Sequence, residues 1–366
     1  MNDLEKFYTQ NKITPVIVIL FPALIILSVL YFAVISCLKI FYRIFSYRSS
    51  LKVLSIGNIT LGGSGKTPFV EWLAQRVSRE GHRAAVLIRG YKTTRETNSF
   101  VSLNYYAYGD EASMLIESLP EEISVMTGKN RIKKVKALQN EGGYDTLILD
   151  DGFQQWGLKR DLDIVTIDAT NPFGNGLLLP AGHLREDIFS LKRADVLCLT
   201  RVYEIGLESR QKLEQLLKKI NPKALYLEAV HEPEYLYALE SSRFLSMESR
   251  IPLENLKGKD VSLCCGIANP GSFLRLIEGA GARVAHKNFF QDHHVFSKDE
   301  LMKMKADCQE QGIRRLIVTE KDAPRLSGAP TLFKHSSVEI LVLKISLKIV
   351  KGLEALDERL RTLYHR

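Results

Sequence analysis

The chain has 366 residues, a formal net charge of +8 and 45% hydrophobic residues. This length suits two domains, or one large domain with additions, and the hydrophobic content allows a substantial core, which excludes a disordered chain. The positive charge is consistent with work against anionic lipid headgroups. Because no dense Lys/Arg run with interleaved aromatic residues is present, nucleic-acid binding is not predicted.

The N-terminal region contains a long apolar segment. Residues 13–38 include no charged residue, and crossing a bilayer takes roughly 20 residues. The residues before this segment are mixed in charge, with Asp3, Glu5 and Lys12, whereas a cleaved secretory signal begins with basic residues. The segment is therefore predicted to remain in the protein and to attach it to a membrane.

The flank after this segment is basic, at Lys39, Arg43, Arg48 and Lys52. Basic residues collect on the cytoplasmic side of membranes, so the flank and everything after it are predicted to lie in the cytoplasm. A single-pass helix and a monotopic helix in one leaflet both remain open. The reasons are two interrupting prolines and several aromatic residues that suit an interface: Pro15, Pro22, Tyr31, Phe32, Phe41, Tyr42 and Phe45.

A glycine-rich run, GNITLGGSGKTP, occupies residues 57–68 between an apolar segment and a helical pattern. Glycines let the backbone N–H groups turn toward phosphate oxygens, while Lys66 reaches the β- and γ-phosphates and the Thr67 hydroxyl ligates Mg²⁺. The run departs from the usual pattern at Thr60, where glycine is typical, but three glycines follow. ATP or GTP binding is therefore predicted, through Thr60, Leu61, Gly62, Gly63, Ser64, Gly65, Lys66 and Thr67.

Short apolar runs alternate with helical patterns along the rest of the chain, which predicts a mostly parallel, doubly wound sheet with ligands at the carboxyl ends of its strands. The runs are Val53–Ile56, Ala84–Ile88, Thr146–Leu149, Ile164–Ile167, Val196–Leu199, Ala224–Leu227, Val261–Cys265, Leu316–Val318 and Ile340–Leu343.

A polar and irregular stretch, His231–Lys259, separates two groups of these runs and is interpreted as an inter-domain region. The predicted organisation is a membrane-associated helix with its basic flank at 1–50, an ATP-binding α/β domain at 51–240, and a second α/β lobe at 241–366.

Two carboxylates, Asp150 and Asp151, end the apolar run that begins at Thr146. In a phosphate-loop protein, acids at this position hold Mg²⁺ or its waters. Considered alone, two acids before Gly152 are more typical of a turn. Because a phosphate loop is also present, we interpret them as metal ligands.

Phosphoryl transfer to an alcohol also needs a proton acceptor and cationic groups. Spacing alone does not choose among the candidate acids and histidines, and Asp110 is also suited to capping a helix. The candidates are Asp110, Glu111, Glu186, Asp187, Asp292, His293 and His294.

Neither the histidine pattern nor the cysteine pattern predicts a further functional site. The His293-His294 pair with Asp292 and His286 lacks a defined ligand spacing, so a metal cluster is not favoured. The five cysteines have no C-x-x-C spacing and are expected to be reduced, mostly buried thiols.

Eight motifs in order make the chain resemble the tetraacyldisaccharide 4'-kinases of lipid A biosynthesis, membrane-attached phosphate-loop kinases of Gram-negative bacteria. The motifs follow the membrane segment and cover nearly the whole chain. They are GNITLGGSGKTP from Gly57, RGY from Arg89, GDE from Gly109, DDGFQ from Asp150, FGNGLLLPAGHLRE from Phe173, GIANP from Gly266, FFQDHHVF from Phe289 and TEKD from Thr319.

The resemblance implies an α/β fold of the P-loop kinase type, with two lobes and an N-terminal membrane helix. It also implies transfer of the γ-phosphoryl of ATP, with Mg²⁺, to the 4'-hydroxyl of tetraacyldisaccharide 1-phosphate, giving lipid IVA. The implied place of work is the cytoplasmic face of the bacterial inner membrane, among anionic lipids, and no obligatory protein partner is expected.

The resemblance further implies a role for individual residues. Lys66 and Thr67 would bind phosphates and Mg²⁺, Asp150 and Asp151 would serve the metal, and Asp110 would be the base, assisted by His293. The same active-site shell would include Glu111, Arg131, Gln154, Arg185 and Glu186.

Two positions depart from the family pattern. Gln155 stands where a histidine is usual, and His183 stands where proline is common. Neither lies in the phosphate loop, so activity is expected. The main alternative is a membrane-recruited switch ATPase, but such proteins typically carry a lysine where this chain has Leu61.

Overall fold

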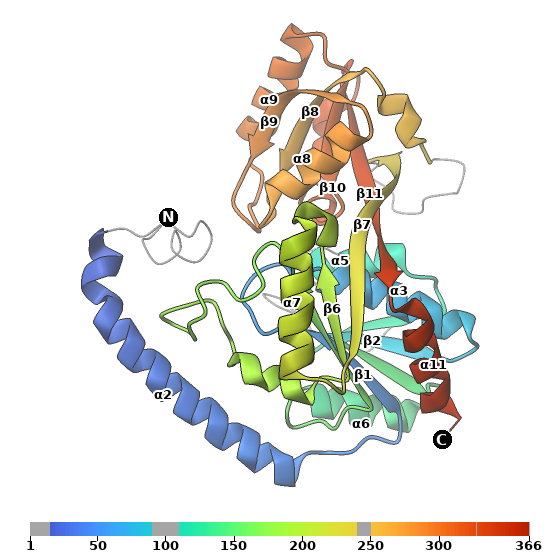
Figure 1. Ribbon diagram of the computed structural model, residues 1–366. Coiled ribbons are helices and arrows are strands. Elements are labelled where there is room, and N and C mark those ends of the chain that lie inside the picture. Colours follow the sequence, from blue (N-terminus) through green and yellow to red (C-terminus); the bar gives the residue numbers. More distant parts are fainter. Residues whose placement is uncertain (1–14, 90–109, 240–249, 327, 366) are drawn as a thin grey trace.

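The computed structural model describes residues 15–89, 110–239, 250–326 and 328–365; the side chains of 15–18, 110, 111 and 117 are outside this description. One sheet of 11 strands runs through both halves of the molecule, in the order β3-β2-β4-β1-β5-β6-β7-β11-β10-β8-β9. All neighbouring strands are parallel except β7 and β11. The predicted mostly parallel α/β fold is therefore confirmed (Figure 1).

The first half of the sheet follows the phosphate-loop pattern of strand, loop and helix. Its strands are β1 (Lys52–Gly57), β2 (Ala84–Ile88), β3 (Ser124–Thr127), β4 (Thr146–Asp150), β5 (Leu162–Asp168) and β6 (Val196–Thr200). Its helices are α3 (Lys66–Arg79), α5 (Asp110–Ser118), α6 (Arg131–Glu141), α7 (Leu207–Ile220) and the short η1 (Ile188–Arg193) and η2 (Val202–Glu204).

The second half is smaller. Its strands are β8 (Asp260–Cys265), β9 (Arg283–Phe289) and β10 (Arg315–Thr319). Its helices are α8 (Pro270–Gly279), α9 (Lys298–Glu310), α10 (Ala329–Phe333) and the short η4 (Leu253–Leu256) and η5 (Ala323–Leu326).

Two long antiparallel strands, β7 (Leu225–Ala238) and β11 (Glu339–Lys351), join the halves (Figure 1). The start of β7 pairs with β6, while the start of β11 pairs with β10. The interpretation of His231–Lys259 as irregular is wrong for its first part, because β7 continues through Pro233 to Ala238. The pairing of the two strands is irregular beside Pro233, since Lys344 is opposite Tyr235 and the next residue, Ile345, is opposite Pro233.

The helices cover both faces of the sheet because successive side chains of a strand point to opposite faces. Leu54 of β1 lies in a core cluster with Phe69 and Leu73 of α3, whereas Val53 lies in a second cluster with Val135 of α6. The C-terminal helix α11 (Leu353–Tyr364) returns to the first half, where Leu356 and Leu360 join the cluster of α3. The division into domains at 51–240 and 241–366 stays a prediction.

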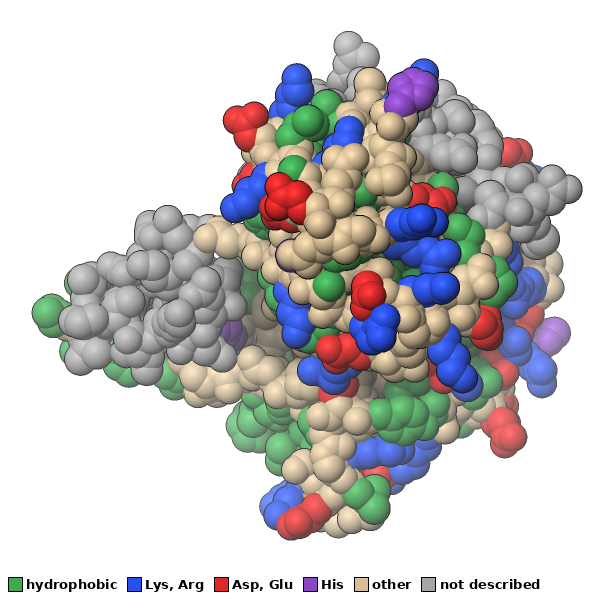
Figure 2. All heavy atoms as spheres, turned by 90° about the horizontal axis from the view of Figure 1, so that it is seen from above, with side chains coloured by type: hydrophobic (Ala, Val, Ile, Leu, Met, Phe, Trp, Pro, Cys, Tyr) green, Lys and Arg blue, Asp and Glu red, His purple; other side chains and the backbone are tan. Residues whose placement is uncertain are grey.

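The N-terminal helix α2 (Pro15–Phe45) extends along the outside of the molecule, away from the sheet (Figure 1). Its Ile19–Phe45 part is long and apolar enough to cross a membrane. Only 11% of the most apolar stretch within it is buried, so it is not a core helix. Pro22 lies inside the helix without ending it. By contrast, the end of the molecule that carries β8–β10 presents interspersed acidic and basic side chains (Figure 2).

One face of α2 is docked on the loop that precedes η1. Ser28 donates to the carbonyl of Leu178 at 2.9 Å, and the Tyr31 hydroxyl donates to the carbonyl of Arg185 at 2.9 Å. Lys39 forms an ion pair with Glu186 at 2.7 Å. The helix is thereby fixed to the same loop that supplies two predicted site residues.

Candidate functional site

The phosphate loop lies at the carboxyl end of β1 and leads directly into α3. Gly65 precedes the helix in the left-handed conformation, with φ of 78°, which favours glycine. The loop is paired with the segment before Glu186, since Leu61 N–H donates to the carbonyl of His183 at 2.8 Å and Arg185 N–H donates to that of Ile59 at 2.7 Å. Residues Gly62–Thr67, which include the start of α3, line an open space, and the N-terminus of a helix is suited to binding phosphate.

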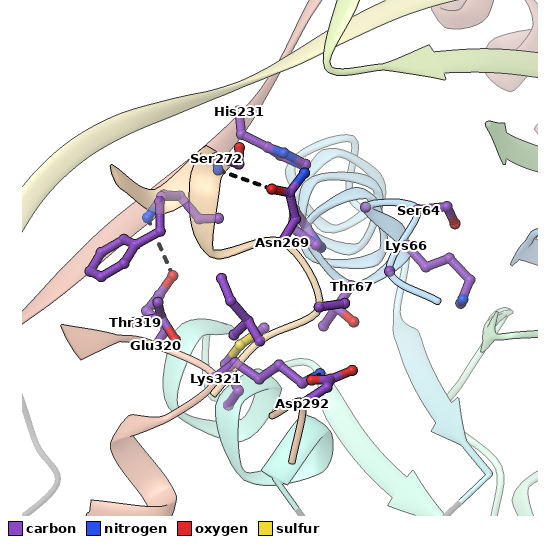
Figure 3. A pocket seen from close by; sticks show the side chains of 18 of the residues that line it. Ser64, Lys66, Thr67, His231, Asn269, Ser272, Asp292, Thr319, Glu320 and Lys321 are labelled. Atoms are coloured by element: carbon purple, nitrogen blue, oxygen red, sulfur yellow. Dashed lines mark hydrogen bonds and ion pairs between the residues drawn. The ribbon is translucent and has the colours of Figure 1, made fainter. Parts of the chain in front are cut away.

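That space is a cavity of about 370 Å³ between the two halves of the molecule (Figure 3). Residues Gly62–Thr67 form one wall. The opposite wall comes from the second half, including Asn269, Asp292, His293 and Lys321. The structure therefore brings six of the eight predicted nucleotide-binding residues to a cavity shared with a predicted catalytic histidine. Thr60 and Leu61 line a neighbouring cavity of about 190 Å³, together with Gly62–Ser64.

The two acids at the end of β4 differ in their contacts. Asp150 is buried, with 3% of its surface exposed. Asp151 lies 3.8 Å from the ammonium of Lys66 and accepts two hydrogen bonds from Arg185, Nη1 to Oδ1 at 2.7 Å and Nη2 to Oδ2 at 3.0 Å. Asp151 therefore links the phosphate loop to the segment that contains Arg185.

These cations determine the charge of Asp151. Burial alone raises the pKa of the carboxyl, but Lys66, Arg185 and Arg131 together lower the pKa to about 2. Asp151 is thus ionised at neutral pH, and its negative charge holds two cations beside the phosphate loop.

Three further predicted site residues form hydrogen bonds in this region: Arg131, Gln154 and Glu186. Arg131 is buried and donates to the backbone carbonyls of both acids, Asp150 at 2.6 Å and Asp151 at 3.2 Å. Gln154 donates to Glu186 and to the carbonyl of Asn58, both at 2.9 Å.

Glu186 has two further cationic partners, Arg193 at 2.6 Å and Lys39 at 2.7 Å. Burial alone raises the pKa of Glu186, but Arg193 and Lys39 hold it below its ordinary value. Glu186 thus stays ionised and connects the site to α2.

The proposed base and its neighbour begin α5. The backbone of Asp110 and Glu111 forms the first turn of this helix, and their side chains lie outside the described residues. Met114, later in the same helix, lines the cavity. The start of α5 is therefore close to the cavity wall.

His293 lies in a loop that the second half holds against the cavity. Its backbone is left-handed, with φ of 62°, and its N–H donates to the carbonyl of Gly266 at 3.2 Å. Its Nε2 lies 3.4 Å from the ammonium of Lys321, which donates to Asp292 Oδ1 at 2.8 Å. In Figure 3, Lys321 and Asp292 extend toward one another on the side of the cavity that faces Thr67.

Several cavity residues were not predicted from the sequence, among them Asn269, His231 and Lys321. Asn269 caps α8, and the GIANP motif that contains it was its only signal. His231 packs behind Gly65 and had no sequence signal, since it lies in the stretch interpreted as irregular. Lys321 belongs to the TEKD motif, which was recognised without a role for its lysine. All three come from elements that only the tertiary fold brings to the phosphate loop.

Hard oxygen ligands occur where Mg²⁺ would be needed. The Thr67 hydroxyl stands at the start of α3, and Asp150 ends the strand next to β1. Magnesium favours one or two carboxylates plus phosphate oxygens and water over a complete protein cage. No group of three His, Cys, Asp or Glu side chains suited to a metal is found within the described ranges. The residues present fit such a Mg²⁺ site.

Comparison with known proteins agrees with this site. Residues 20–364 match the family described as Tetraacyldisaccharide-1-P 4'-kinase. A protein named Tetraacyldisaccharide 4'-kinase from Halothermothrix orenii is 39% identical over 312 residues, which cover 81% of this chain and 80% of that protein. One of the same name from Anaeromyxobacter sp. (strain K) is 35% identical over 319 residues, covering 86% and 82%.

A solved structure is similar over nearly its whole length. It is the crystal structure of the "apo" form of LpxK from Aquifex aeolicus in complex with ATP, with a TM-score of 0.70 and 25% sequence identity. The match covers 94% of this chain and 99% of that chain.

Proposed function

The chain belongs to the tetraacyldisaccharide 4'-kinase family and is an ATP-dependent lipid kinase, and from this premise we propose how its residues perform the reaction. The reaction transfers the γ-phosphoryl of ATP to the 4'-hydroxyl of tetraacyldisaccharide 1-phosphate, giving lipid IVA. The observation that carries the proposal is the cavity between the phosphate loop and the loop of His293.

The phosphates of ATP would lie on Gly62–Thr67. Backbone N–H groups and the positive end of α3 stabilise the phosphate charge, and Lys66 contacts the β- and γ-phosphates. Lys66 is held near Asp151 at 3.8 Å. Its ammonium would therefore lie beside the phosphate loop, where it can contact the γ-phosphoryl group during transfer.

Thr67 and Asp150 would hold Mg²⁺. Both oxygens of Asp151 accept hydrogen bonds from Arg185, so Asp150 is the better direct ligand and Asp151 organises the cations around it. The metal, when bound, neutralises charge on the β- and γ-phosphates.

Asp110 would accept the proton of the attacking hydroxyl, with His293 orienting its carboxylate. Support comes from position: α5 begins at Asp110 and reaches the cavity at Met114, while His293 lines the same cavity from the second half. A carboxylate base with an imidazole partner is a common arrangement for general base catalysis.

Cationic side chains would stabilise the charge that develops on the transferred phosphoryl group. Arg185 and Lys66 both lie at Asp151, beside the phosphate loop. Arg131 lies behind them and fixes the backbone of the two acids. Preorganised cations of this kind lower the barrier because they need no reorientation during the reaction.

The membrane helix would lie in the cytoplasmic leaflet of the inner membrane rather than cross it as an isolated helix. Its polar contacts at Ser28, Tyr31 and Lys39 attach one face to the body of the protein. The other face is apolar and exposed, with exposed fractions of 57% at Leu30 and 58% at Val34. In this position, acyl chains stay in the leaflet and only the sugar headgroup enters the site, among anionic lipids.

The alternative of a membrane-recruited switch ATPase is not favoured. The matched family consists of lipid kinases, and Leu61 replaces the lysine typical of such switches. A switch would also leave the loop of His293 at the cavity unexplained.

The role of His293 is tested by His293→Asn, because asparagine tolerates the left-handed backbone at φ of 62°. We expect acceptor-dependent ADP production to fall about 100-fold. His335→Asn is a matched control, since His335 is exposed and has the same φ of 62°.

Asp110→Ala should remove most turnover in the same assay. A near-normal rate in either site variant would refute its assigned role.

A further inference from the structure

The loop after β10 has an internal scaffold that holds it in place. The Thr319 hydroxyl donates to Asp322 Oδ2 at 2.5 Å, and Asp322 Oδ1 accepts from the N–H of Gly266 at 3.0 Å. Arg325 pairs with Asp322 at 3.1 Å and donates to the carbonyl of His294 at 3.0 Å. Arg325 also donates to the backbone carbonyl of Lys321 at 3.1 Å. The scaffold thus uses the backbone of Lys321 but not its side chain.

The loop is also tied to the phosphate-loop helix through a buried ionic cluster. Lys344 of β11 lies 2.7 Å from Glu71 of α3 and 3.1 Å from Glu320. The three side chains are 9–10% exposed. Burial alone lowers the pKa of Lys344, but the two carboxylates raise it above its ordinary value, so the lysine stays charged.

Glu71 follows Thr67 by one turn of α3, so its position is determined by the helix that carries the phosphate loop. Breaking a buried ionic contact leaves an uncompensated charge in the interior, which is strongly destabilising. The cluster therefore favours one placement of Glu320 relative to the phosphate loop, and Lys321 follows Glu320 directly.

Lys321 occupies a defined place on the cavity wall. Its side chain is 28% exposed, and its ammonium lies 2.8 Å from Asp292 Oδ1 and 3.4 Å from His293 Nε2. The second oxygen of Asp292 is 3.8 Å from the same Nε2, which is longer than a hydrogen bond. An ammonium is a donor only, so contact with Lys321 favours an unprotonated Nε2 on His293. The ring proton of the neutral imidazole is then on Nδ1.

We propose that Lys321 is a positioning residue of the kinase, whose ammonium holds Asp292 and His293 on the cavity wall facing Thr67 and selects the Nδ1–H form of the imidazole. This inference rests on the proposed role of His293: with Nε2 facing Lys321, Nδ1–H is the donor that the imidazole has left to orient a carboxylate base. The second half of the molecule thereby presents His293 at a place that Glu320, Lys344 and Glu71 fix relative to the phosphate loop.

The primary variant is Lys321→Met, which keeps an unbranched side chain and removes the ammonium. We expect kcat to fall about 10- to 100-fold, with the KM for ATP changed less than about twofold, because the phosphate loop is untouched. Lys321→Arg should recover part of kcat. The matched control is Lys348→Met, since Lys348 forms a 3.1 Å ion pair with Glu232 on the exposed surface of β11 and should leave kcat unchanged.

A double-mutant cycle with His293→Asn separates positioning from other effects. If Lys321 acts through His293, Lys321→Met should change kcat less than about twofold in the His293→Asn background. Losses that multiply would overturn this inference while leaving the proposed function intact. A near-normal rate for His293→Asn alone would instead overturn the proposed role of His293, and this inference with it.

A spectroscopic readout avoids catalysis altogether. In ¹⁵N-histidine-labelled protein, the His293 signals are identified by their loss in His293→Asn. The wild type should show a pyrrole-type Nδ1 and a pyridine-type Nε2, and Lys321→Met should show the other tautomer or a mixture. An Nε2–H imidazole in the wild type, or an unchanged spectrum in Lys321→Met, would contradict the proposal.

Discussion

Arg185 and Asp151 form a two-point ion pair, with Nη1 2.7 Å from Oδ1 and Nη2 3.0 Å from Oδ2. The pair connects the end of β4 to the segment that pairs with the phosphate loop, where Arg185 N–H donates to the carbonyl of Ile59. Arg185 also donates to Asn58 Oδ1 at 3.2 Å. Arg185 thus fixes the position of the phosphate loop relative to Asp151.

Arg185→Lys should disrupt this arrangement, because an ammonium cannot reproduce a two-point contact. We expect kcat for acceptor-dependent ADP production to fall at least about tenfold. Arg283→Lys is the matched control: Arg283 makes the same type of contact with Asp260, at 2.9 and 3.1 Å, but on the surface. Equal effects of the two substitutions would argue against a special role for Arg185.

Gly65→Ala should weaken ATP binding. Gly65 has a φ of 78°, and a Cβ there would lie 3.0 Å from two ring atoms of His231. Gly81, beyond the other end of α3, has a φ of 89° and open space around it, so Gly81→Ala carries similar backbone strain of about 1–2 kcal/mol without the clash. Calorimetric titration should give at least about a tenfold weaker Kd for ATP only in Gly65→Ala. Equal Kd values would show that the loop tolerates the added methyl group.

The strands that escaped sequence analysis lie at the edges of the sheet. All nine predicted runs form strands, but β3 and β9 were missed. Strand β9 alternates between exposed and partly buried residues and contains Arg283, His286 and Lys287, and β3 has only four residues. An edge strand in contact with solvent needs no continuous apolar run, so hydrophobicity alone does not reveal it.

The site was predictable where its residues are close in sequence or follow strand ends. The phosphate loop and Asp151 were both expected at the carboxyl ends of β1 and β4, and Lys66 and Asp151 do lie 3.8 Å apart. The cavity wall formed by His231 and Lys321 was not predictable, because it depends on how β7 and β11 join the two halves.

His231 should make stability sensitive to mild acid. Burial, together with Arg201, lowers its pKa from 6.5 to about 4. Below pH 6.5 the unfolded chain binds a proton at this position that the folded protein does not, so stability falls from pH 6.5 toward pH 4.

The test of this pH dependence is His231→Gln. Between pH 7.5 and pH 5, the wild type should lose about 1–2 kcal/mol more stability than this variant, measured from denaturant midpoints in the same detergent. His335→Asn controls for loss of a histidine at the surface. Identical pH profiles for wild type and His231→Gln would exclude His231 as the source.

The apolar face of α2 should bind membranes. Leu30→Lys/Val34→Lys replaces two exposed apolar side chains and should reduce co-sedimentation with anionic phospholipid vesicles at least about tenfold, because each lost apolar contact costs about 1 kcal/mol or more. Leu207→Lys is the control, since Leu207 is 66% exposed on the body of the protein. Unchanged sedimentation of the double variant would place the membrane contact elsewhere.

The most direct test of the central claim follows the phosphoryl group itself. Detergent-purified protein is incubated with γ-labelled ATP, Mg²⁺ and tetraacyldisaccharide 1-phosphate, and the lipids are separated by thin-layer chromatography. Label should appear in a bisphosphorylated lipid and be lost in Asp110→Ala. ATP hydrolysis with unlabelled lipid would contradict the kinase mechanism proposed for this site.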